Sequence, residues 1–183
     1  MQDRVAIGSN ARAVRQAFLK AIPIFAGLSP TALTQIVNAV EEMEFKRDEV
    51  IVREGEPGNR MFIIRSGSVE IVKNLKQHNE TVLAVLKCQD FLGEMSIIDC
   101  VVRCASIRAI EDTALFSLKG IDLYHLFQHH PDQYAIVILN IARDISVPWA
   151  KTIGRPSPTS SIAVSLSFIH SFSAEIRLRA KTL

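Results

Sequence analysis

The stretch Phe91-Leu-Gly-Glu-Met-Ser-Ile-Ile-Asp-Cys-Val-Val-Arg-Cys-Ala105 places Glu94 and Arg103 in an otherwise mostly apolar run. Gly93 opens it, and residues 94–98 are long enough for one short helical turn. The first N–H groups of a helix lack intrahelical partners and lie at the positive end of its dipole, which favours a phosphate. Arg103 adds a forked, charged donor, whereas an ionised Glu94 accepts hydrogen bonds and suits a sugar hydroxyl. The stretch therefore predicts a site for a sugar phosphate, as in a nucleotide.

This stretch also resembles the phosphate-binding cassette of the cyclic nucleotide-binding domain family. The family pattern reads Phe-Gly-Glu, a small residue, apolar residues, a short loop, then arginine and a small residue before alanine. The matching residues here are Gly93, Glu94, Ser96, Ile97, Arg103 and Ala105. The resemblance implies that Glu94 binds the ribose 2′-OH and Arg103 the cyclic phosphate. It implies ligand contacts from Gly93, Glu94, Met95, Ser96, Arg103, Cys104 and Ala105.

Short strand-like runs, separated by turn residues, lie on both sides of this cassette. They are Val50–Arg53, Met61–Ile64, Val69–Val72, Thr81–Leu86, Ala105–Ala109 and Ala114–Leu118. Strands at this spacing predict an antiparallel sandwich or barrel. The family resemblance, which covers residues 22–146, implies a mainly β fold with flanking helices. The specific expectation is an eight-stranded β-roll, a jelly-roll-like double-stranded β-helix.

Helical patterns flank the strands. Apolar periodicity and start signals predict helices at Ser9–Ala21, after Ser29-Pro30, at Gly120–His129 and from Pro131 to about Ile145. The last two match the B and C helices of the family, and Pro148 predicts a break after them. We therefore expect a helical lead-in at residues 1–21, the binding domain at 22–146 and a basic Pro/Ser-rich tail at 147–183.

The base of a bound nucleotide would need an apolar surface. The candidates are Ile64, Val72, Val82 and Leu83 on strands, and Trp149 beyond the C helix. Stacking of Trp149 on the base and its use as an anchor for the tail are equal alternatives. Cys104 stands where a hydroxyl can bond the phosphate and, in some family members, guanine. A thiol is a weaker donor, so cAMP is favoured over cGMP as the ligand.

Other functional classes find little support. The net charge of +2 does not by itself argue for nucleic acid or membrane, and 48% hydrophobic residues indicate a folded chain. The start lacks the apolar core of a signal peptide, and the three cysteines lack metal-ligand spacing. We expect a cytoplasmic protein with free thiols, no metal and no cofactor. The thiols of Cys100 and Cys104 are expected to be buried and unreactive. No P-loop or nucleophile motif occurs, so no enzyme activity is expected.

The sequence thus predicts a regulatory module that binds a cyclic nucleotide and relays binding through its C-terminal helices to a downstream protein. A homodimer through the C helix is a further hypothesis. Two alternatives remain open. One is a docking module of the same fold that binds no nucleotide, because Asp99-Cys-Val-Val102 replaces the usual glycine-containing loop. The other is a transcription-regulator-like protein without its DNA-binding domain, so DNA binding is not expected.

Overall fold

The computed structural model describes residues 2–94, 97 and 102–152, with side chains described for residues 11–94, 97 and 102–144. The chain divides into two compact units, residues 1–141 and residues 142–183. All the described strands belong to the first unit.

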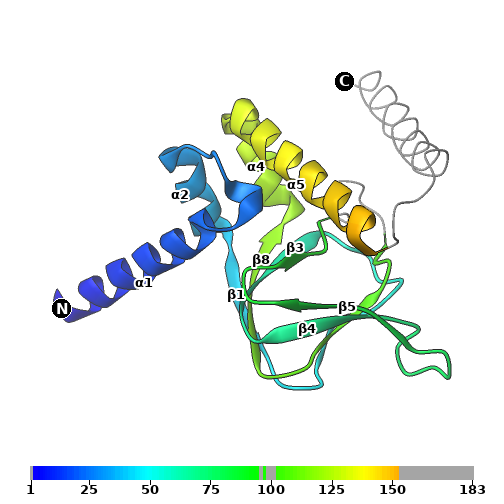
Figure 1. Cartoon of the computed structure of the whole chain (residues 1–183). Coiled ribbons are helices and arrows are strands. Elements are labelled where there is room, and N and C mark those ends of the chain that lie inside the picture. The colour runs from blue at the N-terminus through cyan, green and yellow to red at the C-terminus, as the bar shows by residue number, and fades with distance from the viewer. Residues whose placement is uncertain (1, 95–96, 98–101, 153–183) are drawn as a thin grey trace. The chain divides into compact units, whose positions relative to one another are not determined.

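Two antiparallel four-stranded sheets form the centre of the first unit (Figure 1). One sheet has the order β1-β8-β3-β6 and the other the order β2-β7-β4-β5. Their bounds are β1 Glu41–Phe45, β2 Val50–Val52, β3 Arg60–Ser66, β4 Ser68–Lys73, β5 Thr81–Lys87, β6 Phe91–Leu92, β7 Ser106–Ala109 and β8 Thr113–Lys119. The predicted mainly β fold is confirmed, as a β-roll of two sheets and not a closed barrel.

The core lies between the two sheets, and β8 shows why it forms. Successive side chains of a strand point to opposite faces. Leu115 of β8 faces inward and shares a buried cluster with Phe62 and Ile64 of β3 and Ile107 of β7. Phe116 and Leu118 point to the outer face, where α2 and α4 cover the strand. Both faces of β8 are thus covered, which explains why residues 113–118 are all buried.

The helices lie before and after the strands. They are α1 Gln2–Lys20, the short 3₁₀ helix η1 Pro23–Phe25, α2 Pro30–Ala39, α4 Gly120–His129 and α5 Pro131–Thr152. The Ser29 hydroxyl accepts a hydrogen bond from the Ala32 N–H, with Pro30 in the first turn, so the predicted start of α2 is confirmed. The Asp122 carboxylate accepts one from the Lys119 N–H at the start of α4.

Two helix boundaries differ from the sequence predictions. Helix α1 begins at Gln2 and not at Ser9, and α5 continues to Thr152 through Pro148, where the sequence predicts a break. A proline costs a helix one backbone hydrogen bond and introduces a clash with the preceding turn. A helix that is already nucleated over several turns can absorb that loss, since propagation is far easier than nucleation.

Candidate phosphate-binding site

Arg103 is the central residue of the candidate site, and it is buried. Its residue exposure is 6%, and its guanidinium carbon lies 5.6 Å from the centre of the Phe62 ring. Nη2 donates a hydrogen bond to the Arg60 carbonyl at 2.7 Å, and Nη1 donates to the Gly93 carbonyl at 3.5 Å. A buried guanidinium held by an aromatic face and backbone carbonyls has a fixed orientation, which suits recognition of a phosphate.

Gly93 lets the chain pass close to this guanidinium. Pairing of β6 with β3 places Leu92 opposite Phe62, and Gly93 follows with a φ of +80°. A Cβ atom at this position would lie 2.6 Å from Arg103 Nη1 and 3.3 Å from the Arg60 carbonyl oxygen. Glycine is therefore required here for two reasons, the left-handed backbone and the space that Arg103 occupies.

The backbone that carries Arg103 is anchored at several points. The Arg103 N–H donates to the Glu56 carbonyl at 2.8 Å, and the Arg103 carbonyl accepts from the Gly55 N–H at 2.9 Å. Lys73 Nζ, from the end of β4, donates to the Cys104 carbonyl at 2.8 Å and to Glu54 Oε1 at 2.6 Å. These contacts hold the segment after the cassette loop against the turn that follows β2.

The electrostatics of the site favour an anion. Burial lowers the pKa of Arg103, the charge of Arg60 lowers it further, and Glu56 and Glu94 act in the opposite direction. Arg60 is itself partly buried, with Nη1 donating to Ser117 Oγ at 3.2 Å and lying 3.6 Å from Glu41 Oε2, which offsets part of its charge. A phosphate beside both guanidinium groups would offset the burial of one charge and the repulsion between the two.

The cassette residues are described only in part. Glu94 is half-buried and close enough to affect the pKa of Arg103, and the Ile97 N–H donates to the Glu94 carbonyl at 3.0 Å. Ala105 is half-buried and follows Cys104 directly. Met95, Ser96 and residues 98–101 lie outside the described residues, so the predicted short helix is described only at Ile97.

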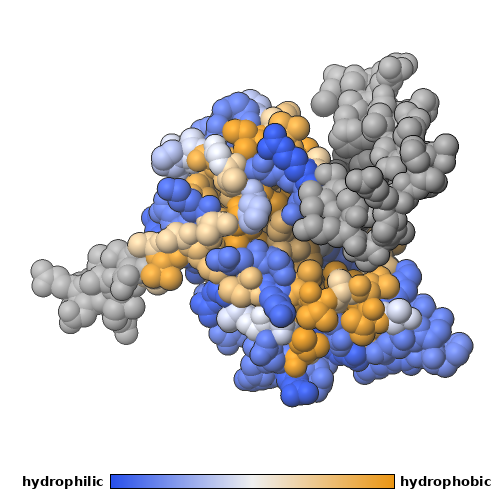
Figure 2. Space-filling view, viewed as in Figure 1, coloured by the Kyte–Doolittle hydropathy of each residue, from blue (hydrophilic) through white to orange (hydrophobic). Residues whose placement is uncertain are grey.

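The candidate base contacts fall into two groups. Ile64 and Val72 are fully buried in the core, at 0% exposure. Val82 and Leu83 of β5 are 48% and 56% exposed, and Figure 2 shows apolar surface over β4 and β5. The structure therefore does not join the four into one accessible surface. Trp149 lies in α5, in the part of that helix where side chains are not described.

The cysteines correct one sequence prediction. Cys104 is exposed, whereas the sequence predicts that Cys100 and Cys104 are buried thiols, and Cys100 lies outside the described residues. Cys88, for which only a free thiol is expected, is exposed as well. Cys104 stands between the buried Arg103 and the half-buried Ala105, and its carbonyl accepts a hydrogen bond from the Lys73 ammonium. Within the described residues, no group of His, Cys, Asp and Glu is placed to hold a metal ion. Nor does that part of the chain contain a helix long and apolar enough to span a membrane.

Three residues contribute to the site but are not predicted from the sequence. Arg60 supplies the second positive charge and a carbonyl acceptor, Phe62 supplies the ring under Arg103, and Lys73 anchors the backbone. Each lies far from Arg103 in the sequence. Only the strand pairing brings them together, although Lys73 at the end of an apolar strand is a usable signal.

If the site binds a cyclic phosphate, as the sequence predicts, Gly93→Ala should weaken that binding by about tenfold or more, equivalent to about 1.4 kcal/mol. The new methyl group would overlap Arg103 Nη1 and displace the guanidinium. Isothermal titration with cAMP measures the change. Gly27→Ala is the control, because Gly27 also has a positive φ, +84°, while its Cβ would make only an ordinary 3.7 Å contact with Ile136. Equal affinity of the two variants would contradict the placement of Arg103 at the ligand.

Comparison with known proteins agrees with this geometry. Residues 42–130 match the family model described as the cyclic nucleotide-binding domain. The chain is 33% identical over 95 residues to a CRP-like cAMP-activated global transcriptional regulator from Mycobacterium tuberculosis, which covers 52% of this chain and 42% of that protein. The chain thus spans less than half the length of that relative.

Solved structures show the same fold. A cyclic nucleotide-binding domain from Methylobacillus flagellatus has a TM-score of 0.68 at 22% identity, covering 80% of this chain and 85% of that one. The regulatory subunit of a cAMP-independent protein kinase A from Trypanosoma brucei has a TM-score of 0.64 at 25% identity, covering 76% of this chain and 47% of that one. Both likenesses support the β-roll fold described above.

Proposed function

Because residues 42–130 of this chain form a domain of the cyclic nucleotide-binding family, we propose that it binds a cyclic nucleotide at Arg103 and acts as a regulatory module. The observation that carries the proposal is the buried Arg103 guanidinium, oriented by the Phe62 ring and two backbone carbonyls. The module has no catalytic activity of its own in this proposal. Its output would be a change in conformation.

Each part of the ligand has a proposed contact. Arg103 binds the cyclic phosphate, with Arg60 adding positive charge, and Glu94 accepts a hydrogen bond from the ribose 2′-OH. The exposed side chains of Val82 and Leu83 are the better candidates for the base, because Ile64 and Val72 have no exposed area in the structure. Gly93, Met95, Ser96, Cys104 and Ala105 complete the cassette in this proposal, and Trp149 stays a candidate for stacking on the base.

The ligand is proposed to be cAMP and not cGMP. The weak donor capacity of the Cys104 thiol disfavours a guanine contact. The likeness to a cAMP-activated regulator supports the same choice.

The relay is proposed to begin where the cassette meets α4. Ile97 Cγ2 lies 3.9 Å from the position of a Cβ at Gly120, the first residue of α4, and the Gly120 N–H donates to the Asn59 carbonyl at 2.8 Å. Helix α5 is the next element in the proposed relay, because it contacts the segment around η1. Asn140 donates to the Ile24 and Ala26 carbonyls at 3.2 and 2.9 Å. A ligand that binds one arrangement of the cassette more tightly would shift the population of these helices.

Thermal and chemical denaturation with and without ligand test the proposal. A ligand at 100 times its Kd should raise the free energy of unfolding by about 2.7 kcal/mol. We expect this rise with cAMP, a smaller one with cGMP at the same concentration, and none with 5′-AMP, which lacks the cyclic phosphate. No stabilisation by either cyclic nucleotide at millimolar concentration would contradict nucleotide binding.

A docking module that binds no nucleotide is the second candidate. The two β-branched residues Val101 and Val102 stand before Arg103, where the family uses glycine and often proline. The likeness to the regulatory subunit of a cAMP-independent protein kinase A supports a role that does not depend on cAMP. The denaturation experiment separates the two candidates. Homodimerisation through α5, a downstream protein partner, absence of DNA binding and a cytoplasmic location stay predictions.

A further inference from the structure

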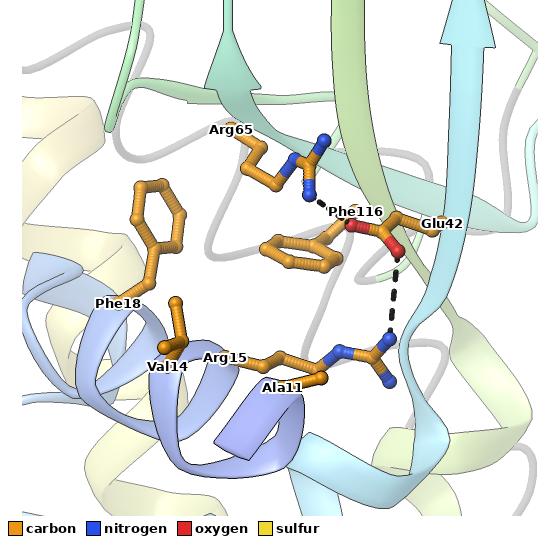
Figure 3. Close-up of a pocket in the computed structure, with 7 residues that line it drawn as sticks. All are labelled: Ala11, Val14, Arg15, Phe18, Glu42, Arg65 and Phe116. Atoms are coloured by element: carbon orange, nitrogen blue, oxygen red, sulfur yellow. Dashed lines mark ion pairs between the residues drawn. The ribbon is translucent and has the colours of Figure 1, made fainter. Parts of the chain in front are cut away.

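A pocket of about 460 Å³, open to solvent on one side and called the cavity below, lies between α1 and the sheet that contains β1, β8 and β3 (Figure 3). Its volume falls within the range of small-molecule sites, roughly 300–1,000 Å³. Figure 3 shows side chains from α1 and from the neighbouring strands β1, β3 and β8 pointing toward it. The lining residues are Ala11, Val14, Arg15, Phe18, Glu42, Arg65 and Phe116.

This cavity is separate from the candidate phosphate site. Glu42 of β1 pairs directly with Phe116 of β8, so both side chains lie on one face of the sheet. That face is the outer one, because the Phe116 ring lies 5.7 Å from the ring of Phe18 in α1. Phe62, which supports Arg103, belongs to the inner core cluster. The sheet itself therefore lies between the two sites.

The charges of the cavity are unbalanced. Glu42 Oε1 contacts Arg65 Nη1 at 2.6 Å, and Glu42 Oε2 contacts Arg15 Nη2 at 3.6 Å. One carboxylate thus serves two guanidinium groups, which leaves one excess positive charge among the lining residues. The side chains of Arg15, Arg65 and Glu42 are 33%, 42% and 39% exposed, so a ligand can reach them.

The apolar part of the cavity lies beside these charges. The Arg15 guanidinium stands 5.6 Å from the centre of the Phe116 ring, and Phe18 packs against the same ring. Val14 adds an aliphatic side chain to the lining and is 64% exposed. An apolar body placed here would cover Val14 and the exposed part of Phe18.

From this combination we propose that the cavity binds a small amphipathic carboxylate, an aliphatic or aromatic acid. Its carboxylate lies between Arg15 and Arg65 and shares them with Glu42, and its apolar body packs on Val14, Phe18 and Phe116. Guanidinium groups bind carboxylates through paired hydrogen bonds, which gives the ligand its orientation. Neither a cation nor a neutral alcohol of the same length satisfies the excess positive charge.

Isothermal titration of the full chain with decanoate tests the proposal, with decyltrimethylammonium as the matched ligand of opposite charge. We expect saturable one-to-one binding of decanoate and binding of the cation that is weaker by about tenfold or more, equivalent to about 1.4 kcal/mol. Comparable binding of the two ligands, or no saturable binding of decanoate at millimolar concentration, would overturn the proposal.

The decanoate affinities of three variants distinguish a carboxylate site from simple hydrophobic binding. Arg65→Gln should weaken decanoate binding about tenfold, whereas Glu42→Gln should strengthen it, because the ligand no longer competes with a protein carboxylate. Arg47→Gln is the control, since Arg47 is exposed and pairs with Asp48 outside the cavity. Opposite signs support the carboxylate site. Unchanged affinity in Arg65→Gln, or weakening in Glu42→Gln, would contradict it.

Two further variants keep the test decisive. Val14→Asp changes an exposed helix position and leaves Glu42, Arg15 and Arg65 in place. It puts a carboxylate among the apolar lining residues, so it should abolish decanoate binding. This variant tests the proposal even if Arg65→Gln fails to fold. Retained binding in Val14→Asp would overturn the proposal. Arg103→Leu should bind decanoate normally, because its site lies on the other side of the sheet. Failure of nucleotide binding therefore leaves this test unaffected.

Discussion

Arg103→Leu should weaken cyclic nucleotide binding by about 2–5 kcal/mol, the usual cost of removing one partner from a buried charge pair. The phosphate would lose a forked donor that is 6% exposed and already oriented by the Phe62 ring. Isothermal titration with cAMP measures the loss. Arg103→Lys should fall between Arg103→Leu and the wild type, because an ammonium keeps the charge but not the paired geometry.

The stability of Arg103→Leu should change much less than its affinity. The variant loses the hydrogen bonds to the Gly93 and Arg60 carbonyls, but it also removes a buried charge whose pKa is lowered by burial and by Arg60. These two effects oppose each other. Urea denaturation without ligand checks this point. Undiminished cAMP affinity in a folded Arg103→Leu protein would contradict the site assignment.

Gly67→Ala should destabilise the fold by about 2–5 kcal/mol, the sum of a conformational and a steric cost. Gly67 joins β3 to β4 with a φ of +81°, and a left-handed conformation costs a residue with a Cβ about 1–2 kcal/mol. Its Cβ would also lie 2.5 Å from Thr113 Oγ1 and 2.6 Å from the Asp112 carbonyl oxygen. Overlap of this kind adds about 1–3 kcal/mol, and backbone atoms give way less easily than a flexible side chain.

Gly55→Ala is the matched control for this variant. Gly55 has the same φ of +81°, but no atom lies within 4 Å of the position that its Cβ would take. It should therefore show the conformational cost alone, about 1–2 kcal/mol. Urea denaturation of both variants, with an unchanged m-value, isolates the steric part. Equal destabilisation of the two would show that the turn at Gly67 relaxes and that the contact with Thr113 does not matter.

The sequence predicts the fold well where the signals are local. The serine and proline at residues 29–30 mark the start of α2, and alternation with turn residues locates most of the strands. The spacing from Gly93 to Arg103 is the local signal on which the cassette prediction rests. The end of helix α5 is predicted less well. The prediction considers only the local cost of Pro148, whereas the preceding helical turns allow the helix to continue through it.

By itself, the sequence determined a mainly β fold with flanking helices, because turn chemistry and strand alternation act over a few residues. The β-roll follows from the family resemblance, and the ligand-binding roles of Glu94 and Arg103 stay predictions. Only the tertiary structure decided that Phe62 and Arg60 meet Arg103, that Ile64 and Val72 are closed to a ligand, and that Cys104 is exposed. It also decided that Arg15, Glu42 and Arg65 share one cavity. These juxtapositions depend on the register between strands and on helix packing across long sequence separations, which local patterns do not encode.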